Sequence, residues 1–135
     1  MKSRWALALV IAAPLLLAGC SGAVTNYSGA PEEFAGEPGG DPDSGLQAFW
    51  LHEGTQIAIT ISGSSTCPYI VKGIDVLEPA GEGNRIAADV PPLGNEPCTM
   101  DYVPHTTVFS TPGRITTTEP LTIEVGEQTV VLPVK

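Results

Sequence analysis

Apolar side chains recur at every second position over several short stretches of residues 46–135. Two such runs are Ile57, Ile59 and Ile61, and Leu121, Ile123 and Val125. This period of two is typical of a β-strand with one buried face. No window of ten or more residues shows the apolar stripe of an amphipathic helix. The pattern predicts a domain built from strands.

Six or seven strands are predicted, separated by turns rich in glycine and proline. They cover 47–52, 56–62, 69–78, 85–90, 101–110 with a break at Pro104, 121–125 and 128–134. Gly126 and Glu127 fit a two-residue type II′ turn, which needs a positive φ at its first central residue. Short strands of this kind favour an all-β fold, a small antiparallel β-sandwich that is broadly immunoglobulin-like. We expect Phe49 and Trp50 to lie in or over its core.

Residues 1–19 follow a different pattern. Lys2 and Arg4 precede 14 residues, from Trp5 through Ala18, that carry no polar or charged side chain. A membrane-spanning helix needs roughly 20 apolar residues, so this run has the length of a signal-peptide core instead. Pro14 within it further disfavours a stable helix. The segment predicts export from the cytoplasm.

Leu17-Ala18-Gly19-Cys20 resembles the lipobox of bacterial lipoproteins in all four positions. The resemblance implies cleavage after residue 19, a diacylglycerol thioether on Cys20, and usually acylation of the new amino terminus. Several acyl chains hold a protein on a membrane where one does not. The expected location is the outer side of the cell membrane. The alternative is an ordinary secreted protein whose mature chain begins with a cysteine.

Residues 20–45 lack strand or helix periodicity. From Ser21 to Gly45 the chain has six glycines, three prolines, five acidic residues and no basic residue. Such a composition buries too little apolar surface to offset the ordering entropy. We therefore expect a disordered linker over 20–45 that lifts a folded domain, 46–135, off the membrane.

The chain is acidic, and processing makes it more so. Its formal net charge is −9, and removal of Lys2 and Arg4 would take this to −11. Nucleic acid would be repelled by such a surface, so it is not an expected partner. The expected contacts are the membrane, through Cys20, and an unidentified protein or small molecule of the envelope.

Two cysteines remain in the predicted domain. In an oxidising compartment Cys67 and Cys98 favour a disulfide over free thiols. The pair lacks the C-x-x-C spacing typical of zinc sites. No tryptophan lies between the two cysteines, unlike in immunoglobulin domains. The bridge is therefore expected to join two loops or strand ends.

Three stretches around these cysteines resemble a family of small actinobacterial lipoproteins and secreted proteins. They are WLHEGTQIAIT (50–60), GSSTCP (63–68) and CTMDYVPHTTVFSTP (98–112). The resemblance covers most of 50–112 and supports pairing Cys67 with Cys98. It implies no particular activity.

Candidate chemistry is sparse. His52 and His105 lie near Glu53 and Asp101, and Ser64 or Ser65 could complete a triad, but no G-x-S-x-G motif supports a hydrolase. Cys98, Met100 and His105 could suggest copper, but the order is wrong for a cupredoxin and Cys67 would lose its partner. We expect no enzymatic activity, metal or cofactor.

The best candidate binding patch lies beside the expected disulfide. It comprises Ser64, Ser65, Thr66, Asp101, Tyr102 and His105. The sequence predicts an envelope lipoprotein that acts as a binding or structural module. A small-ligand or metal-binding protein is the alternative, and a hydrolase comes third.

Overall fold

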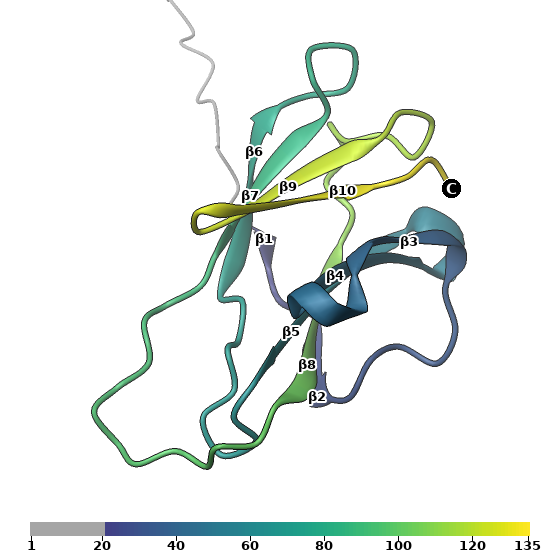
Figure 1. Cartoon of the computed structure of the whole chain (residues 1–135). Helices are drawn as coiled ribbons and strands as arrows, with labels where there is room; N and C mark the ends of the chain where they lie inside the picture. The colour runs from purple at the N-terminus through teal and green to yellow at the C-terminus, as the bar shows by residue number, and fades with distance from the viewer. Residues whose placement is uncertain (1–20) are drawn as a thin grey trace, which may run out of the picture.

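The alternating segments form strands of two sheets that pack face to face (Figure 1). This architecture is that of a computed structural model, which describes residues 21–135. The predicted signal peptide and Cys20 lie outside the described residues. Within 21–135 no helix is long and apolar enough to cross a membrane.

Each sheet has five strands. Sheet A has the order β1 (Ser21–Gly22), β6 (Gly73–Glu78), β7 (Arg85–Asp89), β9 (Leu121–Val125) and β10 (Gln128–Leu132). Sheet B has the order β2 (Thr25–Ser28), β8 (Val103–Ser110), β5 (Gln56–Gly63), β4 (Leu46–Leu51) and β3 (Ala35–Asp41). Two 3₁₀ turns, η1 (Pro42–Ser44) and η2 (His52–Gly54), flank β4. The β-sandwich prediction is confirmed.

The main core fills the space between the sheets. Trp50 and Phe109 of sheet B face Ile86 and Ile123 of sheet A, and all four are fully buried. The indole Nε1 of Trp50 donates a hydrogen bond of 2.8 Å to the carbonyl of Pro133, so its polar group is not left unpaired. The prediction that Trp50 lies in the core is confirmed.

A second apolar cluster lies on the outer face of sheet B. Phe49, Leu51, Ala58 and Val108 are buried there, with Tyr27 packed against them. Phe49, Ala58 and Val108 are register partners, and they alternate along their strands with the residues of the main core. Sheet B is therefore apolar on both faces and needs a cover on the side away from sheet A.

The cover comes from the segment predicted to be a disordered linker, and that prediction is wrong. Residues 21–45 contain β1, β2, β3 and η1, so the sandwich begins at Ser21 and has ten strands within the described chain, not six or seven. The reason lies in the second apolar cluster. Tyr27 and Phe34 look isolated in a polar stretch, but they pack on a face of sheet B that is already apolar.

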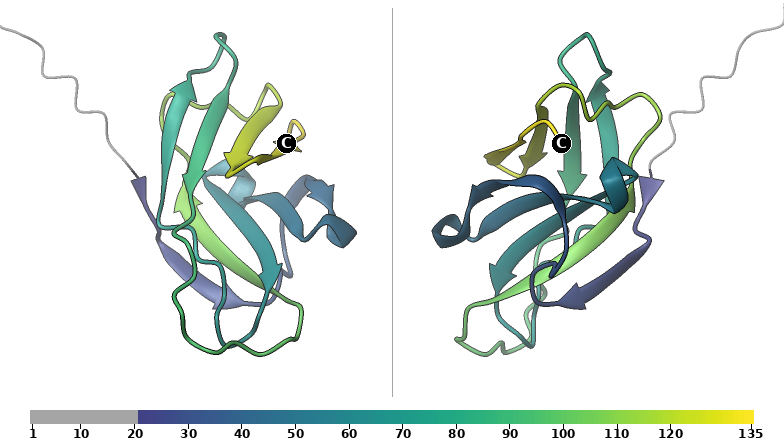
Figure 2. Two further views of the ribbon diagram at one scale, coloured as in Figure 1. Left: turned by 60° about the vertical axis from the view of Figure 1, so that its left-hand side comes forward. Right: turned by 90° about the vertical axis from the view of Figure 1, so that its right-hand side faces the viewer.

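Glycine in this segment serves close packing. β3 lies against β10, and a Cβ at Gly39 would lie only 2.5 Å from the carbonyl oxygen of Val131. Figure 2 shows β3 and β10 approaching each other where the two sheets meet. A glycine-rich composition therefore indicates a tight contact between backbones here and does not indicate a flexible tether.

Two further strand predictions need correction. β7 and β9 are parallel, because the chain leaves sheet A after β7, runs through β8 of sheet B, and returns in the same direction. β8 also continues through Pro104. The carbonyl of Pro104 accepts a bond from the amide of Gly29, and β2 pairing has ended at His105, so the missing amide hydrogen disrupts no ladder there.

The disulfide and the last hairpin are as predicted. Cys67 and Cys98 are bonded across a sequence separation of 31 residues, and they join the β5–β6 loop to the β7–β8 loop. Gly126 has a φ of 59°, while Glu127 is not among the residues with positive φ, as a type II′ turn requires.

Candidate functional site

Four of the six predicted patch residues lie together at the disulfide. The hydroxyl of Ser64 is 2.8 Å from that of Thr99, and the amide of Ser65 donates to the Asp101 carboxylate at 3.0 Å. The hydroxyl of Thr66 accepts from the amide of Thr99. Thr99, which the sequence analysis did not single out, is therefore at the centre of this hydroxyl network.

Hydrogen bonds stabilise the charged form of Asp101. The Ser65 hydroxyl, then the Thr99 hydroxyl and the Ser65 amide, lower the pKa of this carboxyl from 3.8 to about 2. The side chain is exposed, and its Oδ1 accepts from the Ser65 amide and the Thr99 hydroxyl. These contacts fit the role of holding two exposed loops together beside the disulfide.

The other two patch residues lie elsewhere. The Tyr102 hydroxyl is placed over Gly45, where a Cβ would overlap with it, and its ring borders a cavity of about 280 Å³ together with Tyr69 and Gln128. His105 is on β8, and its Nε2 lies 2.9 Å from Oδ1 of Asn26 on β2. Burial lowers the pKa of His105.

The catalytic and copper alternatives find no matching geometry. Cys98 is bonded to Cys67 and the Met100 side chain is fully exposed, so the three residues of the copper alternative do not converge. In the described part of the chain, neither His52 nor His105 is hydrogen-bonded to a carboxylate. Residues 21–135 also contain no group of three His, Cys, Asp or Glu side chains placed to hold a metal ion.

A second concavity lies on the outer face of sheet B, away from the predicted binding patch. It has a volume of about 750 Å³, and we call it the outer groove. Leu51 and Gln56 belong to its lining, as do Val108 of β8 and Thr25 of β2. The rest of the lining is Val24, Tyr27, Pro31, Glu32, Glu33, Phe34, Ala35, His52 and Glu53.

One wall of the outer groove is the segment that links β2 to β3, residues 29–34, which we call the strap. β2 and β3 are the opposite edges of sheet B, so the strap must cross four strand spacings, about 19 Å. Seven residue steps reach about 23 to 25 Å when extended. The excess length allows the bends that the strap makes at residues 29, 32 and 33. The strap is attached by the Thr106 hydroxyl, which donates to the Gly29 carbonyl at 2.6 Å, and by Phe34 on Phe49.

The other wall is the β4–β5 hairpin loop, which has an unusual backbone. His52 and Glu53 have φ values of 47° and 57°, and Gly54 follows with 86°. Two consecutive non-glycine residues in the left-handed region cost of order 1–3 kcal/mol each and persist only when neighbouring contacts fix them. This loop is the only place in residues 21–135 where such a pair occurs.

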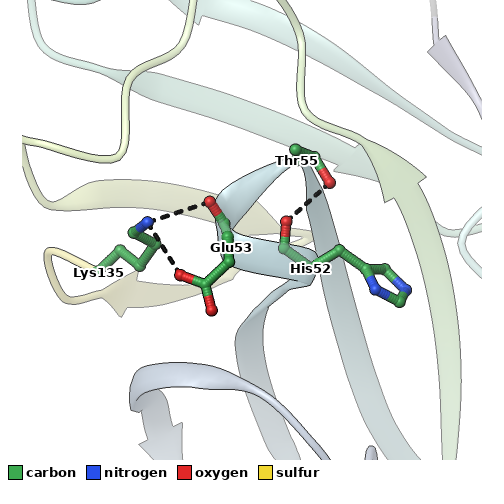
Figure 3. Close-up of polar contacts among 4 residues, drawn as sticks. All are labelled: His52, Glu53, Thr55 and Lys135. Carbon is green, nitrogen blue, oxygen red and sulfur yellow. Dashed lines mark hydrogen bonds and ion pairs between the residues drawn. The ribbon is translucent and has the colours of Figure 1, made fainter.

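Several contacts fix the loop. The amide and the hydroxyl of Thr55 both donate to the His52 carbonyl, at 3.2 and 2.9 Å, and the Lys135 ammonium donates to the Glu53 carbonyl and carboxylate, each at 3.2 Å (Figure 3). The Thr111 hydroxyl donates to the Gly54 carbonyl at 2.7 Å. Figure 3 shows the imidazole of His52 turned away from the Glu53–Lys135 pair.

The outer groove is acidic on its strap side. Glu32 and Glu33 form no ion pair with any residue of 21–135, whereas Glu53 is paired with Lys135. Burial raises the pKa of Tyr27, a hydrogen bond with Thr106 acts against this, and the charge of Glu32 raises it further. The negative charge of the strap therefore reaches the groove lining.

Sequence reasoning missed this site because its parts are far apart in the chain. Only one signal was available in advance, namely that Phe49, Leu51, Ala58 and Val108 give neighbouring strands a second apolar face. No protein-family model matches the chain, and no similar protein was found among the curated proteins or the solved structures.

Proposed function

We propose that this protein is a lipid-anchored protein of the cell envelope whose sandwich domain binds a small ligand in the outer groove. The groove itself carries the proposal: a floor that includes Leu51 and Val108 lies between the strap and a strained hairpin. Strain of this kind is typically kept where it positions functional groups. The volume of about 750 Å³ falls within the range of small-molecule sites, roughly 300–1,000 Å³.

The lipobox resemblance supports the anchor, and the fold adds a consequence. β1 begins at Ser21, the residue after Cys20. A lipid on Cys20 would therefore hold the sandwich directly against the bilayer, with no spacer. Val24 lines the outer groove and is four residues from Cys20, at most about 14 Å along an extended chain. The groove is thus expected to open close to the membrane surface, on its outer side.

The anchor is tested on the full-length chain in a bacterial host. We expect the wild type in the membrane fraction, with mass spectrometry showing a mature chain that begins at an acylated Cys20. Cys20→Ala should move the product out of the membrane fraction, and Ser21→Ala should leave it there. An unmodified Cys20, or membrane retention of the Cys20→Ala variant, would contradict the anchor.

Ligand binding is tested with residues 21–135, which contain both sheets, the core and the disulfide. The probe is N-phenyl-1-naphthylamine, an uncharged dye whose emission rises in an apolar site. We expect saturable binding that Thr25→Trp weakens at least tenfold, because the indole fills the groove. Thr129→Trp, at an exposed position of β10 outside the groove, is the matched control and should bind like the wild type. No saturable binding, or equal binding by both variants, would overturn the proposal.

A further inference from the structure

We infer that the outer groove selects small molecules that carry a positive charge on an apolar body, and that Glu32 and Glu33 of the strap recognise the charge. The inference rests on the proposed binding function and specifies its ligand class. Its basis is the combination of apolar side chains and unpaired carboxylates in the lining of one concavity.

The lining offers apolar surface to a ligand. Leu51 and Val108 are buried at the floor, while Val24, just before β2, and Phe34 of the strap remain 54% and 43% exposed. Exposed apolar side chains that line a concavity are a common mark of a ligand site, whereas scattered ones are not. A ligand with an aromatic or aliphatic body would cover them.

The charge of the groove has one sign. Glu32 and Glu33 come from adjacent positions of the strap and have no cationic partner in 21–135. Lys135, which contacts the hairpin wall, is already paired with Glu53. Arg85 is paired with Glu78 and Glu124 on sheet A. An ammonium or guanidinium group is therefore attracted, and an anionic ligand of the same shape is repelled.

The size of the groove favours a soluble small molecule over a bilayer lipid. Its volume is that of a drug-sized ligand site, and its acidic strap would repel the anionic head groups of a bacterial membrane. An aminophospholipid could offer the same ammonium chemistry, and the experiment below separates the two sources.

The test uses three competitors with one body and different charges: 4-phenylbutylamine, 4-phenylbutanol and 4-phenylbutyrate. Each displaces N-phenyl-1-naphthylamine from residues 21–135 at low salt. We expect the amine to bind about fivefold more tightly than the alcohol, which is the size that two exposed ion pairs supply, and the acid to bind most weakly. The preference should shrink in 0.5 M salt.

Paired variants assign the preference to the strap. Glu32→Gln with Glu33→Gln should bring the amine and the alcohol to equal affinity while the dye still binds. Glu82→Gln with Glu127→Gln removes the same charge from exposed positions outside the groove and should keep the preference.

The outcomes distinguish a failure of the proposed binding function from a failure of the proposed ligand class. Absence of dye binding overturns the proposed function. Dye binding without a preference for the amine, or a preference that survives the strap double variant, overturns only the ligand class. Binding of the domain to vesicles that contain phosphatidylethanolamine, with no displacement by the amine, would overturn the choice of a soluble ligand.

Discussion

Phe34 decides whether residues 29–34 form a fixed strap or a loose linker, and its removal tests the structure directly. Its ring lies 5.0 Å from that of Phe49, with an interplanar angle of 57°, and 43% of the residue remains exposed. The covered part is about 110 Å² of a residue of about 200 Å². At 25 cal/mol per Å² this is worth at most about 3 kcal/mol. Residual burial in the unfolded chain reduces that value.

We therefore expect Phe34→Ala to lower the free energy of unfolding by about 2 kcal/mol, or roughly 8 °C in melting temperature for a chain of this length. Trp50 is the only tryptophan of residues 21–135, so its emission during urea titration reports the transition. Phe34→Leu should recover about half of the loss. Met100→Ala truncates a fully exposed side chain and should leave stability within 0.5 kcal/mol of the wild type.

An unchanged urea midpoint for Phe34→Ala would refute this reasoning. It would mean that the strap does not pack on sheet B and that the disorder predicted from composition is correct. Loss of stability together with weaker dye binding would instead show that the strap both covers the second apolar cluster and forms the wall of the outer groove.

Three further predictions concern the fold. Asn84 is buried with a φ of 50°; its side-chain amide donates to carbonyls of the 116–120 loop, and its Oδ1 accepts from the Thr116 amide. Asn84→Gly should lower the free energy of unfolding by about 2 kcal/mol, because these hydrogen bonds are lost. Asn84→Ala should lower it by about 1 kcal/mol more, because alanine disfavours a positive φ, and urea unfolding measures both changes. Equal losses for the two variants would contradict a role for the backbone angle. Replacing Cys67 and Cys98 by Ala should lower the free energy of unfolding by about 3.7 kcal/mol, because the disulfide closes a loop with a sequence separation of 31 residues. A decrease below 1 kcal/mol in the same assay would contradict this. Because the folded pKa of Asp101 lies below its unfolded value, its carboxylate stabilises the fold above about pH 4 and loses this effect as the pH falls from 3.8 to about 2. The midpoint difference between wild type and Asp101→Asn should be present at pH 5 and mostly lost near pH 2, and an equal difference at both pH values would speak against the assignment.

The direct junction between Cys20 and β1 also changes how an anchored domain would present its surfaces. A disordered linker of 25 residues would let the sandwich turn freely above the membrane. A fold that begins at Ser21 restricts that freedom, because the edge strand of sheet A is then one residue from the acyl chains. Surfaces close to β1 and Val24 would remain near the bilayer.

The sequence alone determined the strands of residues 46–135, the last hairpin and the pairing of Cys67 with Cys98. These features depend on neighbouring residues or on simple counting. The period of two along a strand follows from backbone geometry. A single glycine is enough to allow the positive φ that the hairpin turn needs, and two cysteines in an oxidising compartment are enough to predict a disulfide.

The tertiary structure decided what residues 21–45 do and where a ligand could bind. In composition these residues look disordered, because ordering entropy outweighs what their few apolar side chains could bury among themselves. The fold changes that balance. Phe34 packs on Phe49, and Gly39 lies against β10, on surfaces that form only when distant strands pair. The outer groove likewise joins the strap, β8 and the β4–β5 hairpin. A local pattern could not show it, because burial is a property of the whole assembled chain.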